Sequence, residues 1–314
     1  MPLYIEPHAG VQPLLQVVAS AHRELDMGVY LLTDKRLLAA LKSAQARGVD
    51  VRVIIEGKPF GMKSWQVRRE EEAIAATGVA WKIAPYRFTS HGDHDAFYHA
   101  KFASNGVECA IGTANMDWSA LGHRNREYLY VTKNPAVVSA VHAVFNADWT
   151  NRHAPESAHR VLVLSPGTSA AQLLEVIDQP GPIDAESEEL GPYRPILDAL
   201  AAKGKNLRLL LPASINAQGQ RDVAFLRAHG VQVRLMPKKP LYMHAKMLCG
   251  RQFAFVGSEN FTRTSLESNR ELGLILGGRD IQILQAQFNR DWARAAQGGG
   301  VVGRVRSWWH RHVG

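Results

Sequence analysis

The chain has 314 residues, a length that suits one large domain or two of ordinary size. Its apolar fraction of 46% is typical of a globular protein, and no run approaches the roughly 20 apolar residues that span a bilayer. The first residues lack the features of a signal peptide, but an export signal already removed would leave the same sequence. The compartment therefore stays open. The net charge of +8 favours a polyanionic partner such as a phosphate ester, a nucleic acid or an anionic membrane surface.

The first elements in chain order alternate between helix and strand. Residues 37–47 have the apolar spacing of a helix, Gly48 ends it, and residues 49–55 alternate as a strand. The polar segment 87–97 comes next. Short β-compatible runs follow at 99–104, 108–113 and 127–131. This order predicts an α/β protein in which helices cover a sheet.

The same order returns after a polar stretch at 154–159, which we interpret as the join between two halves. Residues 196–211 repeat the helix, glycine and strand around Gly204. Later strands are predicted at 244–249, 253–258 and 271–276. We therefore predict halves over 1–156 and 157–298 and a basic, tryptophan-containing tail over 299–314.

Chemistry-bearing residues recur in register between the halves. His99, Lys101, Gly112 and Asn115 return 145 positions later as His244, Lys246, Gly257 and Asn260, and Glu127 returns 144 positions later as Glu271. One His-x-Lys arises easily by chance, whereas five co-registered positions do not. The first half is longer before its His-x-Lys, mainly within 87–97, and this predicts a loop at the rim of a site.

Each His-x-Lys suits phosphoryl chemistry because side chains two apart in an extended segment face the same side. Two halves related by a pseudo-twofold axis would place two imidazoles and two ammonium groups around one site. One imidazole can attack phosphorus while the other protonates the leaving alkoxide and then activates water or an alcohol. The groups predicted to hold the non-bridging oxygens are Lys101, Lys246, Asn115 and Asn260.

Two further pairs complete the predicted site. Glu127 and Glu271 are candidates to accept a hydrogen bond from imidazole Nδ1. Thr113 and Ser258 are candidates to donate to the substrate. No metal or cofactor is expected, because the ammonium groups take the part that Mg²⁺ plays in other phosphoryl transfers.

The motif HAK followed after ten residues by GTAN or GSEN, twice in one chain, resembles the phospholipase D superfamily. The resemblance extends from about Leu3 to Ala296. It implies an α/β/α sandwich with a mixed β-sheet in each half, a shared site at their interface and a covalent phosphohistidine. It also implies that His99 is the nucleophile and His244 the general acid, although the symmetry of the sequence does not decide between them.

The chain departs from the family at one place. The family motif usually continues HxKxxxxD, and here Asn105-Gly106 and Gly250-Arg251 occupy that region. That aspartate is generally structural, so its loss bears on how the strand behind each lysine is braced.

Three features lie outside the repeat. The histidines and aspartates of 91–95 are predicted to form a hydrophilic loop, which gates the site or contacts substrate, rather than a metal site. Glu186, Glu188 and Glu189 are predicted to form a solvated helix N-terminus. The tail combines arginines with Trp308 and Trp309. It is interpreted as a packed helix, a peripheral membrane contact or a base-stacking segment.

We therefore predict a phospholipase D-type phosphodiesterase that cleaves phospholipid headgroups, with transfer to an alcohol where one outcompetes water. The alternatives are a metal-independent nuclease of the same superfamily and a cardiolipin-synthase-like phosphatidyltransferase. A catalytically silent lipid- or nucleic-acid-binding module is the alternative outside the enzymes. A pocket with apolar, aromatic walls would favour lipid and an open basic groove would favour nucleic acid. One chain carries both halves, so no obligate protein partner is expected.

Overall fold

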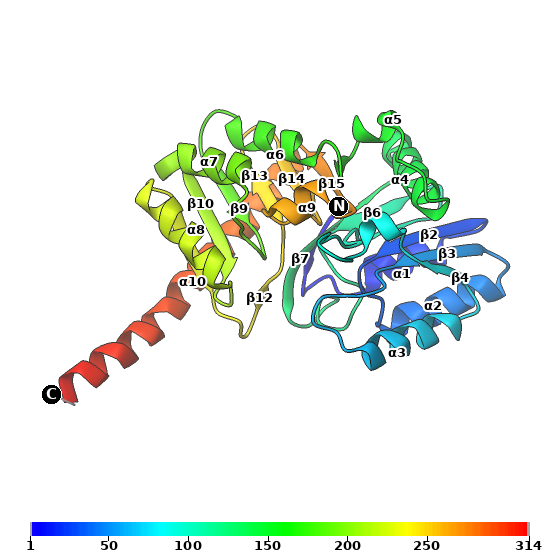
Figure 1. Cartoon of the computed structure of the whole chain (residues 1–314), viewed down its shortest axis with the longest axis horizontal. Helices are drawn as coiled ribbons and strands as arrows, with labels where there is room; N and C mark the ends of the chain where they lie inside the picture. The colour runs from blue at the N-terminus through cyan, green and yellow to red at the C-terminus, as the bar shows by residue number, and fades with distance from the viewer. Residues whose placement is uncertain (1, 313–314) are drawn as a thin grey trace.

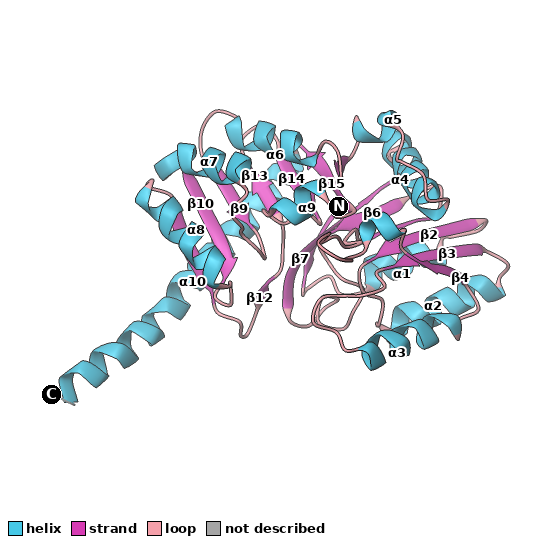
Figure 2. Cartoon of the chain, viewed as in Figure 1, coloured by secondary structure: helices cyan, strands magenta, loops and turns pink. Residues whose placement is uncertain are grey.

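Two mixed β-sheets lie side by side, each with helices packed on its faces (Figures 1 and 2). The structure is a computed structural model that describes the backbone of residues 2–312 and the side chains of residues 2–296. The predicted α/β architecture, with a mixed sheet in each half, is confirmed.

The first sheet has the strand order β1-β7-β6-β5-β2-β3-β4. Strands β2, β3 and β4 run parallel to one another, and β5, β6, β7 and β1 continue the sheet as antiparallel neighbours. Its strands are β1 (Leu3–Glu6), β2 (Glu24–Val29), β3 (Asp50–Ile55), β4 (Ala80–Ile83), β5 (Phe102–Ser104), β6 (Cys109–Gly112) and β7 (Asn125–Thr132). Its helices are α1 (Gln12–Ala19), α2 (Lys35–Ala46), α3 (Ser64–Ala75), the 3₁₀ turn η1 (Tyr86–Phe88) and α4 (Pro135–Trp149).

The second sheet repeats this plan in the order β11-β10-β9-β13-β14-β15-β8. The short helix α5 (Glu156–His159) lies where the chain crosses between the sheets. The strands are β8 (Val163–Ser165), β9 (Ile183–Glu186), β10 (Leu207–Pro212), β11 (Gln232–Met236), β13 (Met247–Cys249), β14 (Ala254–Gly257) and β15 (Glu271–Leu276). The helices are α6 (Ser169–Asp178), α7 (Arg194–Lys203), the 3₁₀ turn η2 (Gly204–Asn206), α8 (Ala217–Ala228), α9 (Arg263–Glu267) and α10 (Arg279–His312).

Helix α2 illustrates how local sequence sets these elements. Asp34 caps it by accepting hydrogen bonds from the backbone N–H groups of Arg36 and Leu37. The buried face carries Leu37, Leu41 and Ala44 at helical spacing. Gly48 then adopts a φ of 84°, which glycine tolerates best, and turns the chain into β3.

Other polar side chains brace the strands behind the lysines where the family aspartate is missing. After β5, Asn105 donates to the carbonyl of Val17 in α1 and accepts from the backbone of Val107 and Glu108. After β13, Gln179 reaches from the end of α6 and accepts from the backbone of the β13–β14 turn. Each turn is thus tied to the helix that packs beside it.

A short exchange of backbone joins the halves. Strand β12 (Tyr242–Met243), which directly precedes the second His-x-Lys, pairs in parallel with β7 of the first sheet. In return, the segment before the first His-x-Lys pairs with the start of β15, because Arg270 N donates to Phe97 O and His99 N donates to Arg270 O, each at 2.9 Å. The two His-x-Lys segments therefore lie at the interface.

Two buried ion pairs also cross this interface. Arg126 of β7 contacts Asp291 of α10 at 2.7 Å, and Arg270 contacts Asp148 of α4 at 2.8 Å. All four side chains are almost fully inaccessible. Because a buried charge is costly without a partner, these reciprocal pairs couple the folding of the two halves.

The structure differs from the sequence predictions at the acidic run 186–189 and at the end of the second half. The interpretation of the acidic run as a solvated helix N-terminus is wrong, because Glu186 is the fully buried last residue of β9 and α7 begins only at Arg194. The backbone of α10 continues through Gln297–Gly300, where we expected the second half to end. The side chains of the predicted tail lie outside the described residues. Within residues 2–312, no helix has the length and apolarity to cross a bilayer.

Candidate active site

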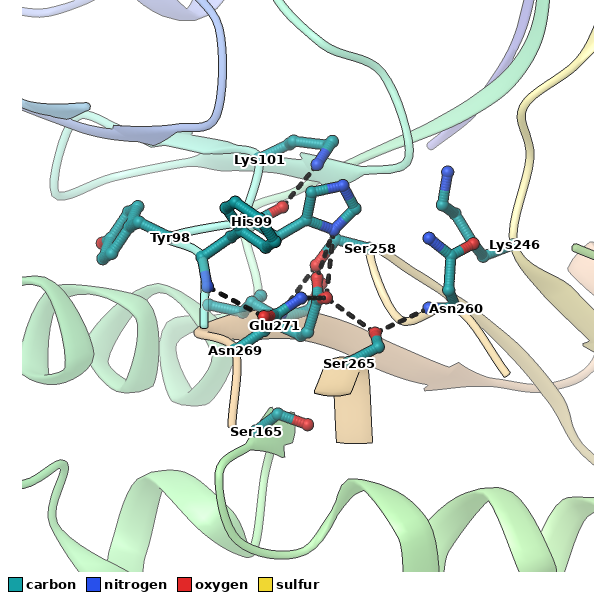
Figure 3. A network of polar contacts seen from close by, with 12 residues as sticks. Tyr98, His99, Lys101, Ser165, Lys246, Ser258, Asn260, Ser265, Asn269 and Glu271 are labelled. Atoms are coloured by element: carbon teal, nitrogen blue, oxygen red, sulfur yellow. Dashed lines mark hydrogen bonds and ion pairs between the residues drawn. The ribbon is translucent and has the colours of Figure 1, made fainter. Parts of the chain in front are cut away.

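His99 lies three residues before the start of β5, at the interface between the sheets. Its Nδ1 is 2.8 Å from Oε2 and 3.0 Å from Oε1 of Glu271, which begins β15 of the other half (Figure 3). Burial lowers the pKa of His99, and Glu271 opposes that shift. Within the described residues no hydrogen bond engages its Nε2, so this nitrogen is free for chemistry.

His244 occupies the matching place before β13, and its Nδ1 is 2.7 Å from Oε1 of Glu127. Each glutamate therefore holds the imidazole of the opposite half. The exchange follows from the crossed backbone pairing, because β12 lies along β7 and brings His244 beside Glu127. A carboxylate at Nδ1 fixes the ring orientation and stabilises an imidazolium.

Short polar side chains orient the two glutamates. Thr113 Oγ1 donates to Glu127 at 2.6 Å and Asn125 Nδ2 donates at 3.0 Å. Glu271 accepts from Ser265 Oγ at 2.7 Å and from Asn269 Nδ2 at 2.9 Å (Figure 3).

The two hydroxyls expected to touch substrate are buried. Thr113 and Ser258 are both 0% exposed. Thr113 is committed to Glu127, and the Ser258 hydroxyl accepts from the backbone N–H of Leu272 at 3.0 Å. Neither residue lines the cavity, and their direct contact with substrate stays a prediction. Thr113 therefore positions the Glu127 carboxylate, and Ser258 holds the backbone of β15.

Both lysines are buried at the floor of the site. Lys101 is 1% exposed and donates to the carbonyl of His99. Burial, reinforced by the Lys246 ammonium and opposed by Glu271, lowers the pKa of Lys101 to about 7. Lys246 is 0% exposed and donates to the His244 carbonyl at 2.6 Å and to Glu188 Oε2 at 2.8 Å.

A cavity of about 560 Å³ opens above these groups and is lined by residues of both halves. His99, His244, Asn115 and Asn260 all border it. Asn115 Oδ1 is buried and has no hydrogen-bond partner in the described part of the chain, whereas Asn260 Oδ1 accepts from Glu189 N at 3.2 Å.

The cavity wall contains aromatic and acidic side chains. Its aromatic members are Tyr30, Phe60 and Phe97, and its carboxylates are Asp95, Glu188 and Glu189. Asp95 and Phe97 belong to the inserted loop 87–97, so this loop does form part of the rim. Among the described residues, no group of three or more His, Cys, Asp or Glu side chains is arranged to hold a metal ion.

Sequence reasoning missed two features of this site. Glu188 and Glu189 follow β9 directly into the cavity, a position that their acidic run alone did not reveal. The triplet Asn-Arg-Glu occurs in both halves, at 125–127 and 269–271. Its members orient the carboxylate, pair across the interface and hold the opposite histidine, and the exact repeat was a usable signal.

A family model described as "Cardiolipin synthase, PLD-like domain" matches residues 14–149 and 192–292, well over half of the chain. The chain belongs to the phospholipase D-like family. This phospholipase D-like protein is 31% identical over 105 residues to a cardiolipin synthase from Clostridium perfringens (strain SM101 / Type A). The aligned part is 32% of the chain and 20% of that relative, so the chain spans about a fifth of the relative's length.

Solved structures share the fold of this phospholipase D-like chain. Phosphatidylserine synthase from Haemophilus influenzae Rd KW20 has a TM-score of 0.64 at 10% identity, covering 93% of this chain and 86% of that one. Polyphosphate kinase from Porphyromonas gingivalis has a TM-score of 0.65 at 15% identity, covering 89% of this chain and 48% of that one. At these identities the likeness shows the fold alone.

Proposed function

We propose that this protein is a phospholipase D-type phosphodiesterase that acts on phospholipids through a phosphohistidine. The observation that carries the proposal is the pair of imidazoles from separate halves that border one cavity, each with Nδ1 on a carboxylate of the opposite half. Engagement of Nδ1 leaves Nε2 of each ring as the nitrogen that acts on the substrate.

In the first step, His99 Nε2 attacks phosphorus, and a P–N bond forms as the P–O bond to the headgroup alcohol breaks. His244 gives its Nε2 proton to the departing oxygen. In the second step, His244 takes a proton from water or an acceptor alcohol, whose oxygen attacks phosphorus and releases His99. The buried ammonium groups and the two cavity asparagines stabilise the charge on the non-bridging oxygens.

The environments of the two rings support this division of roles. His244 has Glu127 at Nδ1 and Glu188 at Nε2, at 2.7 and 3.1 Å. Carboxylates only accept hydrogen bonds, so a carboxylate beside each ring nitrogen suits His244 to the role of proton donor. His99 has a carboxylate at Nδ1 only, which leaves a lone pair on Nε2 for attack.

The walls of the cavity support a lipid substrate over a nucleic acid. Three carboxylates border the cavity and would repel a polyanion. Phe60 at the rim is 86% exposed, and Trp65, five residues later at the start of α3, is 54% exposed. Lys58 and Lys63 flank Phe60 in the chain and are exposed too. Exposed aromatics among lysines suit the interface of an anionic bilayer.

Transfer to an alcohol is the variant favoured by the family description and by the named relative. Both outcomes share the phosphohistidine and differ only in the acceptor. The chain alone therefore supports the phosphodiester chemistry more strongly than either acceptor.

The test is a substrate panel with EDTA present throughout. Vesicles of phosphatidylcholine, phosphatidylethanolamine and phosphatidylglycerol are compared with single- and double-stranded DNA, with and without added glycerol. We expect release of headgroup alcohol, a new phosphatidyl ester when glycerol is present, and intact DNA. Cleavage of DNA without turnover of any lipid would replace this proposal with the nuclease alternative.

A further inference from the structure

The pseudo-symmetry of the two halves identifies equivalent positions that hold different residues. Asp26 and Asp184 both pair with an arginine of the neighbouring strand, Arg52 and Arg208. Leu32 and Leu190 each form an isolated bridge to the segment after the Gly-x-x-Asn motif. Asp184 and Leu190 each lie 158 positions after their counterparts, Asp26 and Leu32. By the same offset, Glu188 of the second half is equivalent to Tyr30 of the first.

These equivalent residues treat their His-x-Lys differently. The ring of Tyr30 meets the ring of His99 edge-on, with centroids 4.9 Å apart, and Lys101 Nζ is 5.2 Å from the Tyr30 centroid. Glu188 instead places Oε2 2.8 Å from Lys246 Nζ and 3.1 Å from His244 Nε2. The His-x-Lys of the first half therefore faces an aromatic ring, whereas the His-x-Lys of the second half already contacts an anion.

The Glu188 carboxylate makes the contacts that a phosphoryl oxygen needs in the second half-site. Although burial opposes ionisation, His244 and Lys246 hold the pKa of Glu188 at about 2, so the group is ionised at neutral pH. Tyr242 also donates to it at 3.3 Å. A phosphate oxygen and this carboxylate oxygen cannot share one ammonium and one imidazole nitrogen without strong repulsion.

We propose that Glu188 is an internal anion that fills the second half of the phosphate site in the free protein and is displaced by the phosphate of the substrate. The inference rests on the proposed function, because it takes the His-x-Lys groups as the phosphate site. The Glu188 side chain is 20% exposed and borders the cavity, so it has room to swing towards solvent.

This arrangement has two consequences. Lys246 is completely buried, and Glu188 supplies its counter-charge whenever no substrate is present. A small free anion must displace Glu188 using its phosphate contacts alone, whereas a phosphodiester also gains from contacts along the cavity wall. Glu188 therefore makes the site selective against inorganic phosphate and favours a tethered phosphodiester.

The test compares Glu188→Gln with Glu189→Gln in the full chain, with inorganic phosphate as the probe. Glu189 borders the same cavity, so its substitution removes the same charge, but its side chain forms no ion pair with Lys246 among the described residues. We expect Glu188→Gln to bind phosphate at least about tenfold more tightly than the wild type by calorimetry. Glu189→Gln should show a much smaller gain.

Thermal unfolding provides a second measurement that does not depend on activity. Loss of the counter-charge should lower the melting temperature of Glu188→Gln, and phosphate should restore it because binding to the folded state stabilises that state. Adding Lys246→Met to Glu188→Gln should abolish the phosphate effect. Equal phosphate affinity in the two single variants, or rescue that persists without Lys246, would overturn the proposal.

The two proposals fail separately. If no phosphodiester is turned over while phosphate still binds Glu188→Gln selectively, the proposed function falls and the internal anion stands. If lipid is cleaved while both single variants bind phosphate alike, the reverse holds.

Discussion

At the scale of single residues, the two histidines share a motif but not an environment. Their Nδ1 atoms face equivalent glutamates, whereas their Nε2 atoms face a free cavity for His99 and the Glu188 carboxylate for His244. Proton donation needs a proton on Nε2, whereas nucleophilic attack needs a free lone pair there. The difference in environment therefore supports the proposal that the two histidines have different roles.

Replacement of each histidine by asparagine should separate the two roles. With a p-nitrophenyl phosphodiester, whose leaving group needs no proton, His244→Asn should still form the covalent adduct and then accumulate it. His99→Asn should form none, and both variants should lose at least about a thousandfold in turnover of lipid. The adduct is measured by mass spectrometry after the reaction is stopped without acid, which would hydrolyse a phosphohistidine. An adduct on His244 in the wild type would reverse the assignment.

Lys101 should set the alkaline limit of activity. Burial lowers its pKa to about 7, so raising the pH through 7 removes an ammonium that the transition state needs. We expect kcat/KM, which reports the free protein, to fall as pH rises through about 7. Lys101→Arg keeps its charge and should move this limb to higher pH. If the alkaline fall in kcat/KM is unchanged in Lys101→Arg, a group other than Lys101 causes it.

At the scale of elements, the segment after β3 connects the rim of the cavity to the residues around His99. Lys58 N donates to Glu56 Oε1 at 2.7 Å, and Phe60 N donates to the Tyr30 hydroxyl at 2.5 Å. Tyr30 in turn packs against His99. The exposed Phe60 ring is thus presented on a backbone that is anchored beside His99, the proposed nucleophile.

Phe60→Ser should weaken binding to anionic vesicles by about ten- to a hundredfold, because a phenyl ring contributes roughly 1.5–3 kcal/mol when it leaves water. Phe253→Ser is the matched control. Phe253 is 48% exposed and follows Arg251 in the β13–β14 turn, at the end of β13 away from its His-x-Lys. Sedimentation with phosphatidylglycerol vesicles measures both. Equal losses would mean that general hydrophobicity, not the rim, drives binding.

At the scale of the whole molecule, the halves are coupled by exchanged contacts rather than by apposition alone. One hydrophobic core cluster includes Tyr98 and Phe145 of the first half together with Met243 and Phe288 of the second. The buried ion pairs and the paired backbone cross the same interface. Because each glutamate contacts the histidine of the opposite half, neither half holds a complete imidazole–carboxylate pair by itself.

Arg270→Met should therefore lower the free energy of unfolding by about 3 kcal/mol, because it removes the buried partner of Asp148 across the interface and leaves only Arg87, at 3.1 Å, to pair with that carboxylate. Activity should fall too, since Arg270 directly precedes Glu271. Arg194→Met is the control. Arg194 pairs with Asp198 on the surface at 62% and 49% exposure, and its loss should cost about 0.5 kcal/mol or less. Urea unfolding measures the free energy of unfolding of both variants. Similar losses in the two would show that the Arg270–Asp148 pair does not couple the halves.

The sequence by itself determined the duplication, the two α/β halves and the identity of the paired histidines and lysines. These follow from local patterns, namely apolar period, glycine turns and register between repeats, which survive in one dimension. The asparagines and glutamates of the motif also lie at the site that the structure assembles.

Only the tertiary structure decided which carboxylate serves which imidazole and what stands beside each lysine. The exchange of Glu127 and Glu271 depends on β12 pairing with a strand of the other sheet, a contact between distant segments with no local signature. Glu188 looks like part of a solvated acidic run until β9 is seen to end at the interface. A sequence does not show whether a charged side chain is solvated or buried against a partner. Burial beside a specific partner determines its role, and here that partner comes from a distant part of the chain.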